Sequence, residues 1–171
     1  YGDYLRSGAI ARFANIMDSV QEYAANGGKV LGICNGFQIL LEAGLLPGAM
    51  KRNDSLHFIS KYHTLKVVNT DNTFLSLLNK DDVLNIPVAH HDGNYYIDAN
   101  GLKELEDNNQ ILLKYCDKDG NLVNMNGSIS NIAGICNKQK NVFGLMPHPE
   151  RAIETILGST DGVNMLKGFL Q

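Results

Sequence analysis

The chain has 171 residues, a net charge of −3, 44% hydrophobic residues and 19% charged residues. It is expected to form one globular α/β domain, because it is too apolar for disorder and lacks the basic excess of nucleic-acid-binding proteins. Its three cysteines include no C-x-x-C pair, which argues against a disulfide framework or a structural zinc site and favours a reducing compartment, the cytoplasm. No apolar run approaches the roughly 20 residues of a membrane helix.

The first part of the chain predicts two helices around a buried strand. Apolar residues at steps of three and four predict a helix over residues 4–25, with Asp3 as its N-cap. The Asn-Gly-Gly run at residues 26–28 ends this helix, and residues 29–33 form the apolar run of a buried strand. A second helix follows directly and ends near residues 43–44. The strand between the two helices is expected to be the central strand of a sheet.

The rest of the chain predicts short strands alternating with helices. Strands are expected at residues 65–68, 83–88, 95–97 and 110–117, with a hairpin from residues 132–136 and 142–146. Helices are expected at residues 102–108, 152–157 and 161–170, with Asp161 capping the last, and a short helix or loop at residues 72–78. The turn-prone residues 89–94 interrupt the extended chain between two of the strands.

Cys34 has a distinctive local sequence, Gly-Ile-Cys-Asn-Gly at residues 32–36. A sharp strand-to-helix turn needs small residues two before and two after a nucleophile, because a Cβ there would meet the folded backbone. Such a turn places Cys34 at the amino end of a helix, which favours a thiolate, and leaves the Asn35 N–H free to donate to an oxyanion. The alternative is a buried core thiol, which is the interpretation we favour for Cys116 and Cys136 because neither has a glycine turn.

The second chemical pattern is Pro-His-Pro-Glu-Arg at residues 147–151. His148 precedes a proline and is therefore expected to be extended, so that His148 and Glu150 project to the same side. A carboxylate in that position can accept the Nδ1–H of the imidazole and leave Nε2 to face a thiol. The combination with the cysteine turn is far more specific than either pattern alone.

The other histidines carry a weaker signal. His57 and His63 have no acid at a recognisable spacing and are expected to be surface or packing residues. The run His90-His91-Asp92 could suggest a metal, but adjacent residues of an extended chain point to opposite faces. No metal site is therefore expected.

The turn at residues 32–38 followed by His-Pro-Glu at residues 148–150 resembles the class I, or triad, glutamine amidotransferases. Within that group, residues 1–13, 30–50 and 144–151 resemble the glutaminase subunits of phosphoribosylformylglycinamidine synthases of purine biosynthesis. The resemblance implies an α/β flavodoxin-like open sheet with a nucleophile elbow. Family members begin with two or three βα units before the position of Tyr1, so residues 1–171 are expected to be an amidotransferase domain truncated at its amino end.

The resemblance also implies roles for individual residues. It assigns Cys34 as the nucleophile, His148 as the general base and acid, and Glu150 as the carboxylate that orients His148. It further implies an oxyanion contact from the Asn35 N–H, and glutamine-binding positions at Gln38 and His90. The family's His-Gly-Glu-Gly segment is similar to residues 89–95, but His91 replaces a glycine and Asp92 a glutamate, so that at position 91 a side chain stands where the family has none.

The activity implied is hydrolysis of glutamine, with the ammonia passed to an ATP-dependent synthetase subunit that makes formylglycinamidine ribonucleotide. A small bridging subunit is a further implied partner. No cofactor is expected in this chain, whereas ATP and magnesium are expected in the synthetase. The alternatives are another class I amidotransferase, a cysteine peptidase of related fold, and a non-catalytic partner-binding scaffold. The conjunction of Cys34, His148 and Glu150 argues against the scaffold, and the purine-type segments argue against the peptidase.

Overall fold

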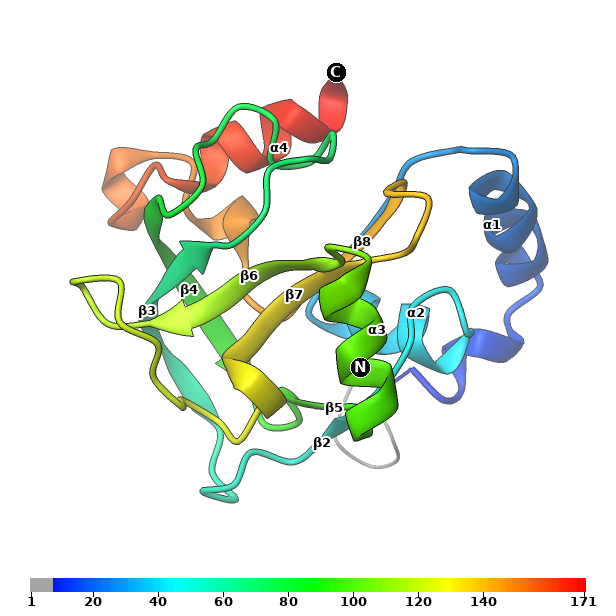
Figure 1. Cartoon of the computed structure of the whole chain (residues 1–171), viewed down its shortest axis with the longest axis horizontal. Helices are drawn as coiled ribbons and strands as arrows, with labels where there is room; N and C mark the ends of the chain where they lie inside the picture. Colours follow the sequence, from blue (N-terminus) through cyan, green and yellow to red (C-terminus); the bar gives the residue numbers. More distant parts are fainter. Residues whose placement is uncertain (1–7) are drawn as a thin grey trace.

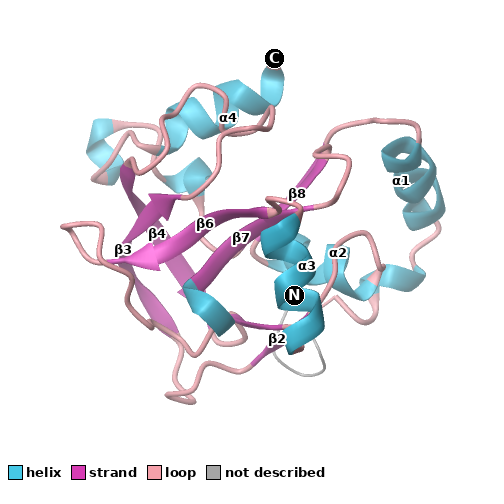
Figure 2. Ribbon diagram, viewed as in Figure 1, coloured by secondary structure: helices cyan, strands magenta, loops and turns pink. Residues whose placement is uncertain are grey.

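The computed structural model describes residues 8–171, which form a mixed six-stranded sheet with helices on both sides (Figure 1, Figure 2). The helices are α1 (Ile16–Ala25), α2 (Asn35–Glu42), α3 (Ala99–Asp107) and α4 (Gly162–Leu170). The strands are β1 (Val30–Ile33), β2 (Ala49–Lys51), β3 (Ile59–Val67), β4 (Val83–His90), β5 (Asn94–Tyr96), β6 (Ile111–Cys116), β7 (Ile132–Cys136) and β8 (Val142–Leu145). Single turns of 3-10 helix lie at Ala11–Phe13, Ile129–Asn131, Pro149–Arg151 and Thr155–Leu157.

The strand order of the sheet is β1-β8-β7-β6-β3-β4. Strands β1 and β8 pair in parallel, and the other neighbours pair antiparallel, including the predicted hairpin of β7 and β8. A separate antiparallel pair is formed by β2 and β5. Strand β1, which was expected at the centre, is therefore at one edge of the sheet formed by residues 8–171. The carboxyl ends of the parallel strands β1 and β8 lie together, which brings the cysteine turn beside the segment that follows β8.

Two apolar clusters fill the spaces above and below the sheet. Alternate residues of β8 belong to different clusters, because side chains of a strand point to opposite faces in turn. Phe143 and Leu145 pack with Met165 of α4, whereas Val142 packs with Phe37 of α2 and Leu105 of α3. The sheet is thus covered on both faces, as expected for an α/β fold.

The amino-terminal helix is shorter than the periodicity predicted. It begins at Ile16, because residues 11–13 form a 3-10 turn and Ala14 is extended, with φ −68° and ψ 136°. Gly8 has φ +86°, and a Cβ on it would lie 2.8 Å from the backbone nitrogen of Ile39 in α2. Gly8 therefore packs closely against α2, whereas Ile10 and Phe13 are each 73% exposed and bury no face that would favour a longer helix. Asp3 and residues 4–7 lie outside the described residues.

The predicted strands are present, but two of them are longer than expected. Strand β3 begins at Ile59 rather than at residue 65, and its first residues are mostly exposed polar side chains. Strand β4 continues to His90, which pairs with Ile59. The polar residues before 65 and after 88 weakened the apolar pattern, although their backbones still pair in the sheet. Residues 72–78 form a loop.

The prediction of a helix over residues 152–157 was wrong. Only Thr155–Leu157 form a 3-10 turn, and Glu154 is extended and forms a bridge with Ser159. Ala152 is buried, but Ile156 is 89% exposed and Leu157 45% exposed, so little apolar surface is buried here to stabilise a longer helix. Asp161 precedes α4 as predicted, but its carboxylate accepts from the backbone N–H of Asn85 instead of capping the helix.

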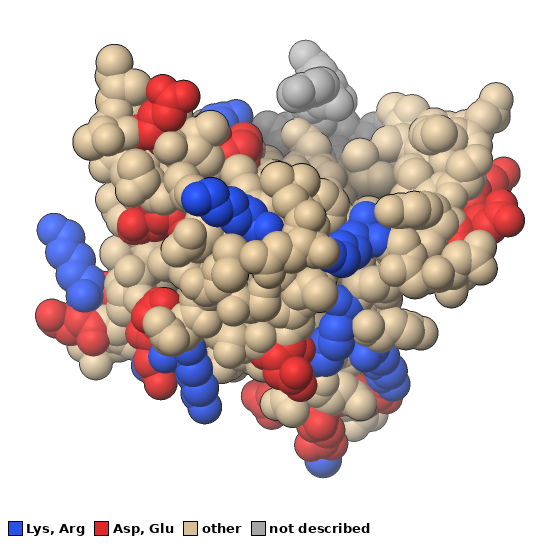
Figure 3. Space-filling model, turned by 90° about the horizontal axis from the view of Figure 1, so that it is seen from above, with Lys and Arg blue, Asp and Glu red and all other residues tan. Residues whose placement is uncertain are grey.

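The surface shows no large region of one charge on the face seen from above (Figure 3). Acidic and basic side chains are interspersed there, in agreement with the small net charge. Among residues 8–171, no helix has the length and apolar character needed to cross a membrane.

Candidate active site

The turn between β1 and α2 is a strained nucleophile elbow, here residues 32–36. Cys34 has φ 51° and ψ −106°, a conformation that a non-glycine residue adopts only where the surrounding structure imposes it. Its N–H donates to the Leu145 carbonyl at 2.8 Å, which ties the elbow to β8. A Cβ on Gly32 would lie 2.7 Å from the carbonyl carbon of Gly36, so the predicted need for glycine is confirmed there.

Gly36 is not required by lack of space. Among the described residues, a Cβ on Gly36 would meet no atom within 4 Å. The prediction that both flanking positions need glycine for lack of space is therefore supported at Gly32 alone. The other two cysteines are fully buried, as predicted, and burial raises the pKa of Cys136 to about 11. Cys34 differs from them because it is only partly buried and lines a cavity.

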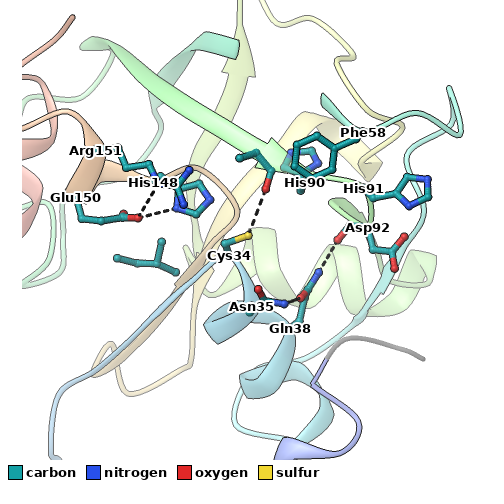
Figure 4. Close-up of a pocket in the computed structure, with 12 residues that line it drawn as sticks. Cys34, Asn35, Gln38, Phe58, His90, His91, Asp92, His148, Glu150 and Arg151 are labelled. Atoms are coloured by element: carbon teal, nitrogen blue, oxygen red, sulfur yellow. Dashed lines mark hydrogen bonds and ion pairs between the residues drawn. The ribbon is translucent and has the colours of Figure 1, made fainter. Parts of the chain in front are cut away.

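His148 and Glu150 form a close pair beside Cys34 (Figure 4). The His148 Nδ1 lies 2.6 Å from Oε1 of Glu150, and the His148 N–H donates to the Pro87 carbonyl at 2.8 Å. The two side chains meet as predicted, but the reason differs. Residues Pro149–Arg151 form a 3-10 turn, and this turn brings Glu150 back toward His148. The predicted extended segment is therefore not the cause of the contact.

The charges at this pair follow from its surroundings. Burial is the largest single influence and lowers the pKa of His148, but hydrogen bonding and charge from Cys34 and Glu150 together outweigh it and raise that pKa to about 9. Burial also raises the pKa of Glu150, and the contacts with His148 and Arg151 reverse this, so that its net pKa is lowered. At neutral pH the pair is therefore an imidazolium and a carboxylate.

The thiol and the imidazole do not yet share a proton in this conformation. The Cys34 Sγ donates to the carbonyl of Ala89 at 3.7 Å, and within residues 8–171 the Nε2 of His148 has no hydrogen-bond partner. The contact with Oε1 of Glu150, at 2.6 Å, is the hydrogen bond that the His148 ring makes in this conformation. Cys34 nevertheless raises the pKa of His148, so the thiol and the imidazole lie close enough to influence each other.

Cys34, His148 and Glu150 share a cavity of about 600 Å³ (Figure 4). Each remaining sequence-predicted site residue also lines this cavity, namely Asn35, Gln38 and His90. Asn35 is the first residue of α2, where backbone N–H groups have no partner within the helix. The structure thus brings together the whole predicted set, which comes from three separate stretches of the chain.

Gln38 links the elbow helix to the opposite side of the cavity. Its Oε1 accepts from Nδ2 of Asn35 at 2.8 Å, and its Nε2 donates to the Asp92 carbonyl at 2.7 Å. The Asp92 side chain in turn lies 3.7 Å from Nε of Arg52. The Gln38 amide therefore holds residues 89–93, called the pocket loop below, against α2.

The backbone of the pocket loop accommodates His91 at the position where the family has a glycine. This residue has a negative φ, so a side chain in place of the family's glycine needs no left-handed backbone. Its Nε2 lies 3.1 Å from the Leu56 carbonyl, and its ring points away from Cys34 in Figure 4. Within residues 8–171 no group of three His, Cys, Asp or Glu side chains could hold a metal ion. The expectation of no metal site stays a prediction.

His57 and His63 are surface and packing residues, as predicted, whereas the role of Asn53 was not predicted. His57 is exposed, and His63 packs its half-buried ring against Tyr115, with ring centroids 5.7 Å apart. Asn53, by contrast, is fully buried and makes several hydrogen bonds to the pocket loop. Its local sequence, Arg-Asn-Asp, is that of any turn and carried no signal of this role.

Comparison with known proteins identifies the family. The family described as "CobB/CobQ-like glutamine amidotransferase domain" matches residues 1–164. The chain is 71% identical over 171 residues to the phosphoribosylformylglycinamidine synthase subunit PurQ of Sulfurimonas denitrificans, covering 100% of this chain and 76% of that protein. The chain belongs to the PurQ family. The PurQ subunit of Wolinella succinogenes is 64% identical over 169 residues, which cover 99% of this chain and 75% of that protein.

A solved structure supports the PurQ assignment at the level of the fold. The structure of PurLQS from Thermotoga maritima matches with a TM-score of 0.87 and 41% identity, over 99% of this chain and 74% of that chain. The predicted α/β fold of the class I amidotransferases is confirmed. This chain spans about three quarters of the length of the PurQ relatives. The predicted boundary of the domain stays a prediction.

Proposed function

We propose that this chain is the glutaminase of a phosphoribosylformylglycinamidine synthase, which hydrolyses glutamine and supplies the ammonia to a synthetase subunit. The observation that carries the proposal is the strained Cys34, which shares one cavity with the hydrogen-bonded pair of His148 and Glu150. The identity of 71% to a PurQ subunit favours this reaction over that of another amidotransferase or a peptidase. A non-catalytic scaffold would have no need of a strained cysteine beside a histidine–carboxylate pair.

The first half of the reaction transfers the glutamyl group to the enzyme. The Cys34 thiolate attacks the side-chain amide carbon of glutamine and forms a C–S bond, while the amide oxygen becomes an oxyanion. The Asn35 N–H donates to that oxyanion, a contact whose loss costs on the order of 10²–10³ in rate. His148 is charged at neutral pH, since its pKa is about 9, and it protonates the leaving nitrogen, so that the C–N bond breaks and ammonia departs.

The second half releases glutamate. The neutral His148 removes a proton from water, and the hydroxide formed attacks the thioester carbon. The C–S bond then breaks, which returns the Cys34 thiolate and the His148 imidazolium. Glu150 keeps the Nδ1–H of His148 directed at itself throughout, so that Nε2 is the atom that exchanges protons.

The proposal extends to partners and location. The solved Thermotoga maritima assembly is named PurLQS, and we propose that this chain assembles in the same way, with a synthetase subunit and a small bridging subunit. ATP and magnesium would then be used by the synthetase and not by this chain. We also propose a cytoplasmic location, which the free state of Cys34, Cys116 and Cys136 supports.

The test compares glutamine hydrolysis by the full-length subunit alone and with its purified synthetase, nucleotide and substrate. We expect the isolated subunit to be at least about tenfold slower, because a partner can order the cavity and complete the oxyanion contacts. The pocket loop is the element through which this would act, since hydrogen bonds rather than apolar contacts hold it. Equal rates alone and in the complex would refute partner gating. A complex that never hydrolyses glutamine would refute the function.

A further inference from the structure

Asn53 is fully buried and binds the pocket loop at both of its ends. Its backbone N–H donates to the His91 carbonyl at 2.9 Å, and its Nδ2 donates to the carbonyls of His57 and His90, both at 2.9 Å. Its Oδ1 accepts from the Gly93 N–H at 3.2 Å and lies 3.1 Å from Nδ1 of His90. Every donor and acceptor of this amide therefore has a partner on or beside the pocket loop.

These contacts determine where His90 carries its proton. Two backbone carbonyls surround one end of the Asn53 amide and can only accept, so that end is Nδ2. The Gly93 N–H can only donate, so the other end is Oδ1. Since Oδ1 is an acceptor, the nearby Nδ1 of His90 must be the protonated nitrogen. The other ring nitrogen of His90, Nε2, then either carries a lone pair, if the ring is neutral, or carries a second proton, if the ring is charged.

The charge state of His90 decides between these two forms. Burial is the main cause that lowers the pKa of His90 to about 4, and the positive charge of His148 adds to it. His90 is therefore neutral at pH 7 and its Nε2 carries a lone pair. Within the described chain Nε2 has no hydrogen-bond partner. A Cβ on Gly93 would lie only 2.2 Å from Nδ1, so the loop backbone lies close against the His90 ring.

The pocket loop presents two carbonyls to the elbow. The Ala89 carbonyl accepts from the Cys34 thiol at 3.7 Å, and the Asp92 carbonyl accepts from the Gln38 amide at 2.7 Å. Both carbonyls belong to residues directly beside those that Asn53 holds. A displacement of the loop would therefore move the two contacts that face the nucleophile and its helix.

We propose that Asn53 is a positioning residue of the glutaminase reaction, which holds the proton of the second imidazole of the cavity, His90, on Nδ1 and gives this buried ring a neutral partner. By the same contacts it sets the distance of the pocket loop from the elbow. The inference rests on the function proposed above. Its physical reason is that a second imidazolium would repel the charged His148, and that this charge is the one that stabilises the thiolate.

Of the charged groups around His90, His148 acts in the same direction, because its positive charge adds to burial in lowering the pKa of His90. The titratable and charged groups that share the cavity are Cys34, His148, Glu150 and Arg151 on neighbouring elements, and His91 and Asp92 on the loop of His90, with Arg52 beside Asp92. Glu150 is engaged by His148, and Asp92 lies near Arg52. The direct partner of the His90 ring is the neutral Asn53, and a neutral partner does not favour the charged form as a carboxylate would.

The first test observes the proton directly in the complete enzyme. The full-length subunit, labelled with ¹⁵N in its histidine rings and assembled with its synthetase, is examined by long-range proton–nitrogen correlation spectra between pH 5 and pH 8. We expect His90 to remain the neutral Nδ1–H form throughout, whereas His148 remains charged. An Nε2–H form of His90, or its titration near pH 6.5, would overturn the proposal without affecting the assignment of Cys34.

The second test is the substitution Asn53→Asp, which keeps an acceptor beside Nδ1 and the Gly93 N–H but adds a charge. We expect the pKa of His90 to rise, so that the ratio of kcat/KM at pH 5.5 to that at pH 8 falls about tenfold. The matched control is Asn141→Asp. Asn141 is also buried and donates to two carbonyls, those of Ala24 and Gly28, at 2.8 Å, but it does not line the cavity.

The control separates positioning from stability. Both variants lose two buried hydrogen-bond donations and are expected to lower the melting temperature, but Asn141→Asp should leave the pH ratio within about twofold. Equal pH ratios in the two variants would refute the role of Asn53. Labelling of Cys34 by a glutamine-like electrophile in the unsubstituted complex reports on the proposed function separately, since that reaction requires the nucleophile and not the charge state of His90.

Discussion

The two sides of the cavity are built in different ways. On one side, the nucleophile and its histidine–carboxylate pair come from two short motifs, each of which shapes its own backbone through a strained turn or a proline. On the other side, the pocket loop has no motif of its own and is held by Asn53 and Gln38 from distant parts of the chain. Reacting groups can thus be local features of a sequence, whereas the groups that hold them are supplied by tertiary contacts.

The largest effect is expected on the motif side, at the cysteines. In the complete enzyme Cys34→Ala should abolish glutaminase activity, because no other group in the proposed mechanism forms the thioester. Cys116→Ala and Cys136→Ala are the controls. Both thiols are fully buried, so these changes should lower the free energy of unfolding by about 1 kcal/mol and leave activity nearly intact. Mass spectrometry after treatment with a glutamine-like electrophile provides the check, and labelling of Cys116 or Cys136 in place of Cys34 would refute the assignment.

The next largest effect is expected at the carboxylate of the triad. Glu150→Gln removes a group that raises the pKa of His148, so we expect kcat/KM to fall about 10²-fold and its alkaline limb to move below the pH of about 9 expected for the unsubstituted enzyme. The stabilising contribution of the His148 proton is complete below pH 6.5 and is lost as pH rises through about 9. The free energy of unfolding, measured between pH 6.5 and about 9, should fall with rising pH in the unsubstituted enzyme and should fall less in Glu150→Gln.

The control for this prediction is Arg151→Gln. Arg151 lies 3.6 Å from Glu150 but is more than half exposed, so solvent screens its charge. Its removal should shift the alkaline limb by a few tenths of a pH unit at most. A shift as large as that of Glu150→Gln would mean that the net charge of the cavity, rather than the contact between Glu150 and His148, determines the pH of the alkaline limb.

A moderate effect is expected from the shape of the elbow. Gly32→Ala places a Cβ against backbone atoms of Gly36 and should cost about 2–3 kcal/mol of stability and part of the activity. Gly36→Ala lies within α2, where alanine favours the helix, and the described residues leave space for its methyl group. Thermal melts and kcat/KM of both variants decide the matter. An equal loss in both would show that the elbow needs glycine on each side, as the sequence pattern first indicated.

The smallest effect is expected on the opposite side, at His91. Since His91 has a negative φ and its ring points away from Cys34, His91→Gly should leave glutaminase activity within a few fold. Chelators should have no effect on the rate. Inactivation by a chelator that zinc reverses would contradict this and would assign the cavity a metal. A large loss in His91→Gly would show that its contact with the Leu56 carbonyl holds the pocket loop as Asn53 does.

The elements that were predicted correctly are those with a strong local signal. The strand and helix around Cys34 and the β7–β8 hairpin combine apolar runs with glycine or polar turns, and they were found nearly at their true bounds. The predictions failed where apolar spacing and tertiary packing disagree. Gly8 packs closely against α2 while Ile10 and Phe13 are exposed, and in residues 152–157 the side chains of Ile156 and Leu157 are exposed.

The sequence by itself indicated which groups of this protein are candidates to react. A cysteine between glycines and a histidine two residues from a glutamate can be recognised because a strained turn and a proline-bounded segment impose their geometry within a few residues. Only the tertiary structure decided that Pro149–Arg151 turn to bring Glu150 onto His148, and that a loop asparagine sets the proton of His90. The reason is physical: burial and hydrogen bonding between distant segments set these charges, and neither quantity exists before the chain has folded.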